Sequence, residues 1–363
     1  MVDDNELKPA LHDRHVEAGA VMGAAAGWVI PMHFAGVAAE VAAVRTGAGV
    51  VDISHVGRIR IRGAQALEAL ERLCTVDVAH QEDLTAARTL LCNEAGGILD
   101  DAWLIRLADE WLLTCSPIAR EKVLAHVEAL TSGMEVKVSD QTSKIFHLAV
   151  AGPATLQRLE PVLPEQAAGL ERHGVRVGSM LLAKWIALRV GYTGTFGVEV
   201  ILPNMLAWQA WRFITQKAGA NCIAPVGLAA RDVLRLEAGL PRYGHELNET
   251  IDPFTAGLDH LLDFGHDFLG RSALEALRGR TPSRRPVGLA GPAQGAIPTL
   301  GSPIADAAGR EVGAVTSGTF SPTLDRLIAL AYVTADTAPD ADVTVQTPTG
   351  PVAMKVTTLP FVP

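Results

Sequence analysis

The feature that most constrains the fold is a change of sequence pattern at residues 281–286, a stretch rich in Pro and Arg (TPSRRP). After it come short apolar runs separated by Gly and Pro, such as VGLAGP, EVGAVTSGTFSP, LIALAYV and DVTVQTPTGPVAMKV. Short strands joined by such turns are typical of antiparallel barrels and sandwiches. We therefore predict a domain boundary here and a separate β domain over residues 287–363.

Before this boundary, helical and strand patterns alternate, which predicts an α+β region over residues 1–280. Helices are expected at residues 9–24, 36–46, 64–73, 118–131, 204–217 and 225–238. In the second of them, Glu40 and Arg45 are expected to face solvent.

The expected strands show a two-residue period or a short apolar run. In VVDISHVGRIRIRG, the arginines Arg58, Arg60 and Arg62 alternate with isoleucines, as on a half-buried strand. A hairpin is predicted around a turn at residues 93–97 (NEAGG), because Asn and Gly there separate two apolar runs. Further strands are expected at EWLLTCS, FHLAVAG, WIALRVG and GVEVILP.

Composition excludes several classes of protein. The chain of 363 residues is 48% hydrophobic, enough for a full core, and its net charge of −9 argues against nucleic acid or an anionic membrane as partner. Residues 18–39 carry no Asp, Glu, Lys or Arg, but they are mostly Ala and Gly and contain Pro31. We interpret this stretch as a buried helix leading into a loop and a strand, not as a membrane span.

The cysteines and histidines show no metal-binding pattern. The four cysteines contain no C-x-x-C pair and the 11 histidines form no H-E-x-x-H cluster, so no metal is expected. Buried thiols and an acidic start (MVDDNE), which is unlike a secretory leader, predict a cytoplasmic protein. The loop GYTGTFG lacks the G-x-G-x-x-G spacing and precedes a strand, so it is not a dinucleotide loop.

Charged residues within apolar segments are the remaining candidates for chemistry. Asp100 and Asp101 follow a Gly-Gly turn, and alternation along a strand points them to opposite faces. Glu199 lies between two valines, and Arg231 and Arg235 are four apart on one helix face. A turn-flanking pair, an exposed glutamate and a surface lattice of ion pairs would equally produce these patterns. If they converge, they suit a flat, polar, partly anionic ligand.

Eight sequence blocks, in order, resemble the aminomethyltransferases of the glycine cleavage system (the T-proteins), within the tetrahydrofolate-dependent one-carbon transferases. They include VVDISHVGRIRIRG, NEAGGILDD, RVGYTGTFGVEV, GLAARDVLRLEAGLPRYGHEL and VTSGTFSPTL. The resemblance extends from about Leu7 to Val362. It implies a three-part cloverleaf around a central folate cavity, with two interleaved α+β subdomains and a C-terminal barrel.

The resemblance also assigns roles to individual residues. The essential aspartate of the GGILDD block is Asp101, with Asp100 as the second candidate and as a residue of the cofactor site. The pterin-binding glutamate is Glu199, the folate-site arginine is Arg231, and Tyr192 lines the cavity.

The implied reaction moves a one-carbon unit from an S-aminomethyl lipoyl carrier protein to tetrahydrofolate, with release of ammonia. A carboxylate near the attacking nitrogen would stabilise the developing positive charge. One alternative is a tetrahydrofolate-dependent demethylase acting on a small O-, N- or S-methyl donor. The other is a non-catalytic folate-binding protein, but the reactive cysteine of such relatives is absent from RVGYTGT.

Two departures from the family fall beside the expected site. Arg88 replaces a tyrosine and Cys115 replaces an asparagine. If Arg88 reaches the cavity, its guanidinium should favour a donor that bears an acidic group. The alternative, which the length of the side chain favours, is that it turns to solvent at the edge of the hairpin.

Overall fold

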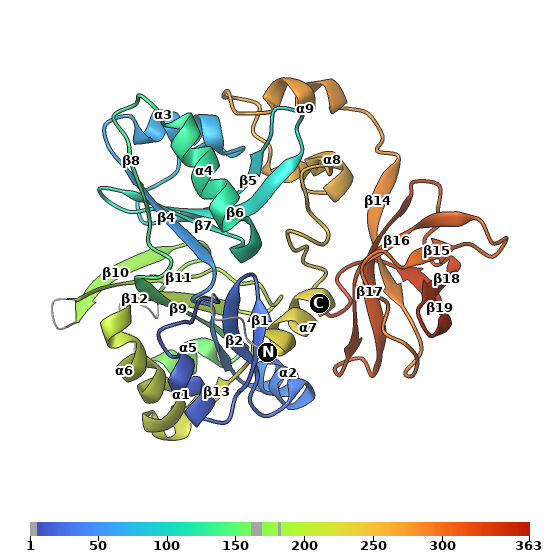
Figure 1. Cartoon of the computed structure of the whole chain (residues 1–363), viewed down its shortest axis with the longest axis horizontal. Helices are drawn as coiled ribbons and strands as arrows, with labels where there is room; N and C mark the ends of the chain where they lie inside the picture. The colour runs from blue at the N-terminus through green and yellow to red at the C-terminus, as the bar shows by residue number, and fades with distance from the viewer. Residues whose placement is uncertain (1–5, 161–168, 181–182) are drawn as a thin grey trace.

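The computed structural model describes residues 6–160, 169–180 and 183–363, so most of the acidic start of the chain lies outside the described residues. Three β assemblies dominate it: a six-stranded sheet, a five-stranded sheet and a closed six-stranded barrel (Figure 1). This arrangement confirms the expected mixed fold with a C-terminal antiparallel barrel.

The six-stranded sheet has the order β10-β11-β12-β9-β3-β13. Its strands are β3 (Gly49–Asp52), β9 (Ile145–Ala151), β10 (Val175–Met180), β11 (Ala183–Leu188), β12 (Gly197–Pro203) and β13 (Ala224–Pro225). The helices of this region are α1 (His12–Glu17), α2 (Val37–Thr46), α5 (Thr155–Leu159), α6 (Ala207–Arg212) and α7 (Leu228–Glu237).

The five-stranded sheet has the order β5-β6-β7-β4-β8 and is formed by the chain between β3 and β9. Its strands are β4 (Gly57–Arg62), β5 (Ala86–Cys92), β6 (Ile98–Arg106), β7 (Trp111–Cys115) and β8 (Lys137–Asp140). Helices α3 (Ala66–Leu73) and α4 (Arg120–Leu130) lie beside it (Figure 1). The chain thus leaves the first sheet, builds the second and returns.

The predicted hairpin between β5 and β6 is present, and its turn shows why two glycines are needed. The side chain of Asn93 accepts hydrogen bonds from the N–H groups of Ala95 and Gly97 at 3.0 and 2.9 Å. Gly96 has a φ of +82°, which favours glycine. A Cβ on Gly97 would lie 1.8 Å from the carbonyl oxygen of Glu249. This turn fixes the start of β6, which carries the aspartate pair.

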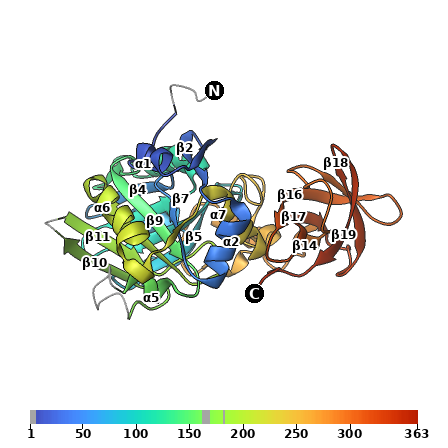
Figure 2. The same cartoon turned by 90° about the horizontal axis from the view of Figure 1, so that it is seen from below.

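The barrel has the order β14-β17-β16-β15-β18-β19 and lies to one side of the two sheets, with α7 and α2 between them (Figure 2). Its strands are β14 (Arg284–Ala290), β15 (Pro303–Ala305), β16 (Glu311–Ser321), β17 (Arg326–Thr334), β18 (Asp342–Thr347) and β19 (Gly350–Thr357). The first strand begins inside the predicted linker, and we retain residues 1–280 and 287–363 as the proposed domains.

The helix predicted over residues 9–24 is wrong beyond its first half. α1 ends at Glu17, and the uncharged stretch forms a hairpin of β1 (Val21–Ala25) and β2 (Trp28–His33). Ala26 and Gly27 have φ values of +51° and +78°, the pattern of a two-residue hairpin turn. Within the described part of the chain, no helix is long and apolar enough to cross a membrane.

Two predictions of solvent-facing charge are also wrong. Glu40 is 2% exposed, because its carboxylate accepts hydrogen bonds from the N–H groups of Ala35 and Gly227 at 2.9 and 2.8 Å. Arg45 packs inward and binds the buried Glu237. These contacts join α2 to the start and the end of α7, which lies far away in the sequence.

Candidate active site

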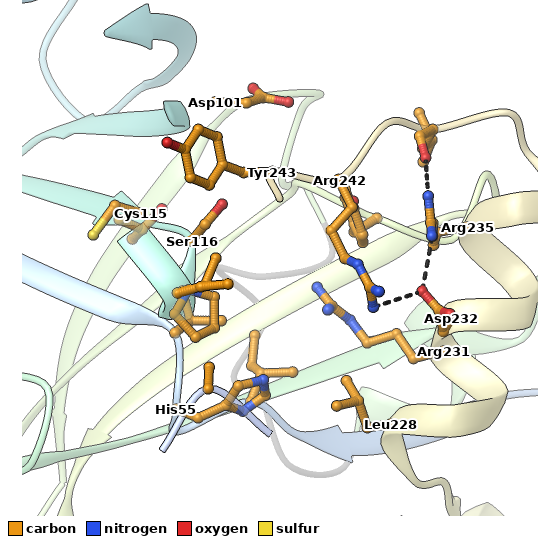
Figure 3. A pocket seen from close by; sticks show the side chains of 18 of the residues that line it. His55, Asp101, Cys115, Ser116, Leu228, Arg231, Asp232, Arg235, Arg242 and Tyr243 are labelled. Carbon is orange, nitrogen blue, oxygen red and sulfur yellow. Dashed lines mark hydrogen bonds and ion pairs between the residues drawn. The ribbon is translucent and has the colours of Figure 1, made fainter. Parts of the chain in front are cut away.

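A cavity of about 400 Å³ lies between the two sheets and α7 (Figure 3). Its lining residues run from Ala25 to His245, so the barrel strands contribute none of them. Both sheets supply a carboxylate to its wall, Asp101 from β6 and Glu199 from β12. The structure therefore brings together residues that are about one hundred positions apart.

Asp101 faces this cavity beside Arg88. Strand pairing places Arg88 of β5 and Thr114 of β7 on either side of Trp103 of β6, so these side chains share one face of the sheet. Asp101 lies two residues before Trp103 on the same strand and therefore points to that face. Arg88 Nε and Nη2 donate to the two oxygens of Asp101 at 2.8 and 2.6 Å. The side chains are 23% and 11% exposed. The expectation that Arg88 turns to solvent is wrong, because the adjacent carboxylate holds it in the cavity.

Asp100 points to the other face of β6, as the alternation predicts. It is fully buried and accepts a hydrogen bond from the N–H of Ser116 at 2.6 Å. Burial raises the pKa of Asp100 to about 7. The cavity lining includes Asp101 but not Asp100, so the structure does not bring the second aspartate to the expected cofactor site.

Glu199 is 14% exposed, and its Oε2 lies 2.9 Å from Nε2 of the buried His147. Burial by itself raises the pKa of Glu199, but the contact with His147 and the charges of Arg231 and Arg58 outweigh it and lower the pKa below its usual range. The carboxylate is therefore ionised at neutral pH and able to accept two N–H bonds from a ligand.

Arg231 extends from α7 into the cavity (Figure 3). Its guanidinium lies 4.8 Å from the centre of the Tyr192 ring. No carboxylate among the described residues lies within 4 Å of it, so its donors are available to a ligand. Tyr192 also lines the cavity, and its hydroxyl donates to the carbonyl oxygen of Pro241. Burial raises the pKa of Tyr192 to about 12, so this ring stays neutral.

Arg235 lies one turn after Arg231 on the same helix face, as predicted, but it is not part of a surface lattice. It is fully buried and donates to Asp232, Glu246 and Ser317 at 2.8, 2.8 and 2.9 Å. Asp232 also accepts from Arg242 at 3.0 Å (Figure 3). Because Ser317 belongs to β16, this network connects the cavity wall to the barrel.

The sequence patterns missed His55 and the contact of His147 with Glu199, whereas Cys115 lies at the site beside which the resemblance to the family placed it. His55 lines the cavity and is 3% exposed; burial, followed by the charge of Arg231, lowers its pKa to about 3 and keeps the imidazole neutral. Cys115 also lines the cavity, and burial raises its pKa well above the usual range, so it is a thiol. The polar Ser-His pair in the apolar run VVDISHV is the only local signal of His55.

The chemistry of this donor set suits an organic ligand. Glu199 accepts N–H bonds, Arg231 donates to an anionic or carbonyl group, and Asp101 places negative charge in the same space. Among the described residues, no group of three His, Cys, Asp or Glu side chains could hold a metal ion. A flat heterocycle with N–H groups and an acidic tail fits these donors and acceptors.

Comparisons with known proteins point to one family. The profile described as "GCVT N-terminal domain" matches residues 11–266, and "Glycine cleavage T-protein C-terminal barrel domain" matches residues 284–363. An aminomethyltransferase of Rubrobacter xylanophilus is 38% identical over 353 residues, covering 97% of this chain and 93% of that protein. One of Moorella thermoacetica is 38% identical over 333 residues, or 91% and 90%.

A solved structure agrees with these relatives. The glycine cleavage system aminomethyltransferase T from Bartonella henselae matches with a TM-score of 0.89 and 32% identity, and the match covers 98% of each chain.

Proposed function

The chain belongs to the glycine cleavage T-protein family, and we propose that its central cavity binds tetrahydrofolate and transfers an aminomethyl-derived carbon to it. The resemblance inferred from the sequence blocks is confirmed. The relatives are named aminomethyltransferases, which does not favour a demethylase or a non-catalytic folate-binding protein. The observation that carries the proposal for the site is that Glu199, Arg231 and Asp101 line one cavity.

Glu199 and Arg231 bind the acceptor in this proposal. The ionised Glu199 accepts N–H bonds from the edge of the pterin, and its buried position makes this contact selective for a ligand that offers N–H donors. The guanidinium of Arg231, which stacks on Tyr192, holds the polar tail. The neutral His55 completes the wall without adding charge near Arg231.

Asp101 is the proposed catalytic residue. Tetrahydrofolate, when bound, supplies the nucleophilic nitrogen that accepts the one-carbon unit. Asp101 places negative charge beside this nitrogen, where positive charge develops during attack, and accepts a proton from it. Arg88 holds both carboxylate oxygens, so the orientation of Asp101 is fixed before the ligand binds.

The partner and location are proposed from the same family. A lipoyl carrier protein delivers the aminomethyl group, and the reaction releases ammonia. We propose a cytoplasmic location, which fits the four free cysteines Cys74, Cys92, Cys115 and Cys222.

The test is the dependence of the reaction on its donor. The purified protein is given tetrahydrofolate with either an aminomethylated lipoyl carrier or a panel of small methyl donors, some bearing carboxylates. Ammonia and methylenetetrahydrofolate should form only when the aminomethylated carrier is the donor. Methyl transfer from a small donor without any carrier would overturn the proposal in favour of a demethylase.

A further inference from the structure

On the half-buried strand that the alternation predicts, Arg58 would lie on the polar face, yet it is one of the most deeply buried side chains of the protein. Its Nη2 donates to the carbonyl oxygens of Ser54 and Thr142 at 2.8 and 2.7 Å. No carboxylate lies within 4 Å of this guanidinium in the part of the chain that the structure describes. A buried cation without a direct counter-ion is costly, so its position calls for an explanation.

Besides a third backbone carbonyl, that of Ile145, the guanidinium of Arg58 contacts a buried histidine. Arg58 Nη1 lies 3.2 Å from Nδ1 of His147, which is also fully buried. A guanidinium only donates, so Nδ1 must accept and the proton of the neutral ring must lie on Nε2. Burial lowers the pKa of His147, which keeps the ring neutral. The protonated Nε2 lies 2.9 Å from Glu199 Oε2, within ion-pair distance, although its N–H is not aligned for a hydrogen bond to that oxygen.

We propose that Arg58 and His147 are positioning residues for Glu199: Arg58 fixes the tautomer of His147, which then holds Glu199 as an oriented carboxylate. This inference rests on the proposed function, in which Glu199 binds the pterin. The relay runs through three strands of two sheets, from Arg58 on β4 through His147 on β9 to Glu199 on β12. This relay accounts for the buried Arg58, because its positive charge stabilises the Glu199 carboxylate across the His147 ring that lies between them.

The groups around Glu199 determine what happens when the relay is broken. The ionisable groups that act on it are His147 from β9, Arg231 from α7 and Arg58 from β4. Burial raises its pKa, and the contact with His147 is the largest influence that lowers it. Without His147, burial is opposed only by the two more distant cations, so Glu199 should take up a proton at higher pH and lose its affinity for an N–H edge.

The experiment measures the affinity for tetrahydrofolate by calorimetry at about pH 8 and about pH 6 in three proteins. The wild type should bind nearly equally at both, after correction for the ligand's own titration. His147→Leu should bind close to wild type at the higher pH and roughly tenfold more weakly at the lower pH. His147→Gln should restore most of this loss, because its amide presents an N–H toward Glu199.

The matched control is His15→Gln. His15 is another fully buried histidine beside a carboxylate, 2.9 Å from Asp52, but it does not line the cavity. His15→Gln should therefore leave the pH dependence of tetrahydrofolate binding unchanged.

Two results would overturn the inference. One is that His147→Leu binds tetrahydrofolate as tightly as the wild type at both pH values. The other is that His147→Leu and His147→Gln lose the same affinity, and lose it equally at both pH values. Failure of the wild type to bind would instead overturn the proposed function.

A second measurement uses only the wild-type protein, so it does not depend on whether a variant folds. The nitrogen-15 shifts of the His147 ring in the wild-type protein report its tautomer. They should show a neutral ring protonated on Nε2 from about pH 8 to about pH 6. A ring protonated on Nδ1, or a charged ring, would contradict the role assigned to Arg58.

Discussion

At the scale of single residues, the two carboxylates of the cavity are held in different ways. Asp101 forms a bidentate ion pair with Arg88, whereas Glu199 lies against the neutral His147. A bidentate guanidinium fixes the plane of the carboxylate. Asp101 is therefore arranged as a fixed negative charge, and Glu199 keeps its second oxygen for a ligand.

The ion pair makes Arg88 important for turnover. Arg88→Met should lower kcat roughly 10- to 100-fold, because Asp101 loses the partner that orients it. The affinity for tetrahydrofolate should change much less. Steady-state kinetics with a lipoyl carrier measure both. Arg60→Met is the control, because Arg60 lies on β4 of the same sheet and is 41% exposed; equal kcat in the two variants would remove Arg88 from the mechanism.

Asp100 should make stability depend on pH. Its folded pKa of about 7 lies above the usual value, so the protonated form stabilises the fold below the unfolded pKa, and this contribution is lost as pH rises toward 7. Asp100→Asn keeps an acceptor for the Ser116 N–H and has no charge to bury. It should be more stable than wild type at about pH 8, by roughly 4 kcal/mol, and equal at about pH 4. Urea unfolding at both pH values tests this; a constant difference would contradict it.

Sequence patterns predicted some of these residues and missed others for physical reasons. Alternation along β6 was enough to place Asp100 and Asp101 on opposite faces. Arg58 and His147 could not be found in the same way, because their partners come from other strands and their burial depends on tertiary packing. Arg88 was predicted to snorkel outward, a tendency that the nearby carboxylate overrides.

At the scale of elements, α7 joins the cavity to the rest of the molecule. One face carries Arg231 and Arg235, while its last residue, Glu237, is fully buried. Glu237 accepts from Arg45 Nε of α2 at 3.0 Å and from the hydroxyl of Ser321 of β16 at 2.6 Å. A single carboxylate therefore connects two helices and the barrel.

Removing this carboxylate should destabilise the protein. Glu237→Ala leaves the guanidinium of Arg45 without its partner, which should cost about 3–5 kcal/mol of unfolding free energy. Ser321→Ala removes one neutral donor and should cost about 1 kcal/mol. Chemical denaturation followed by tryptophan fluorescence measures both. A loss for Glu237→Ala no greater than that for Ser321→Ala would show that the ion pair does not hold α7 in place.

The N-terminal elements show where local patterns are insufficient. The first half of this stretch is mostly Ala and Gly and was predicted to be helical, and only its later part, with Trp28, Val29 and Ile30, is typical of a strand. It forms a hairpin because Ala26 and Gly27 accept a turn with positive φ and because β2 packs against α7. The hairpin between β5 and β6, in contrast, carries its own signal in Asn93 and the two glycines, and was predicted.

At the scale of the whole molecule, the barrel was predictable and the cavity was not. Most of the barrel's strands are joined by short turns, so the pattern of short strands is local, although β14 pairs with β17 and β19, which come later in the sequence. The cavity depends on β3 and β9 pairing across almost one hundred intervening residues, which no short pattern encodes. Only the resemblance to a family indicated that residues from both sheets and α7 would meet.

Ligand binding should stabilise the assembled protein. Because the cavity is formed by both sheets and α7, tetrahydrofolate should bind only the folded chain and raise its unfolding free energy by about 2.7 kcal/mol at a hundredfold excess over Kd. Glu199→Ala should weaken binding by about 1.5–3 kcal/mol, or roughly 10- to 100-fold, and reduce this shift. Thermal unfolding of both proteins with and without tetrahydrofolate measures this stabilisation. If the ligand raised the unfolding temperature of Glu199→Ala as much as that of the wild type, the assignment of Glu199 would be contradicted.

The central claim is that Asp101 provides the catalytic charge in a cavity that other residues use for binding. The most direct measurement compares turnover and tetrahydrofolate affinity in wild type, Asp101→Asn and Asp100→Asn, with an aminomethylated lipoyl carrier as donor. Asp101→Asn should lose roughly 100- to 1,000-fold in kcat with nearly unchanged affinity, because Asn keeps the shape but not the charge. Asp100→Asn should lose far less, since its side chain lies behind the cavity. Near-equal losses in the two variants, or full activity of Asp101→Asn, would contradict the claim.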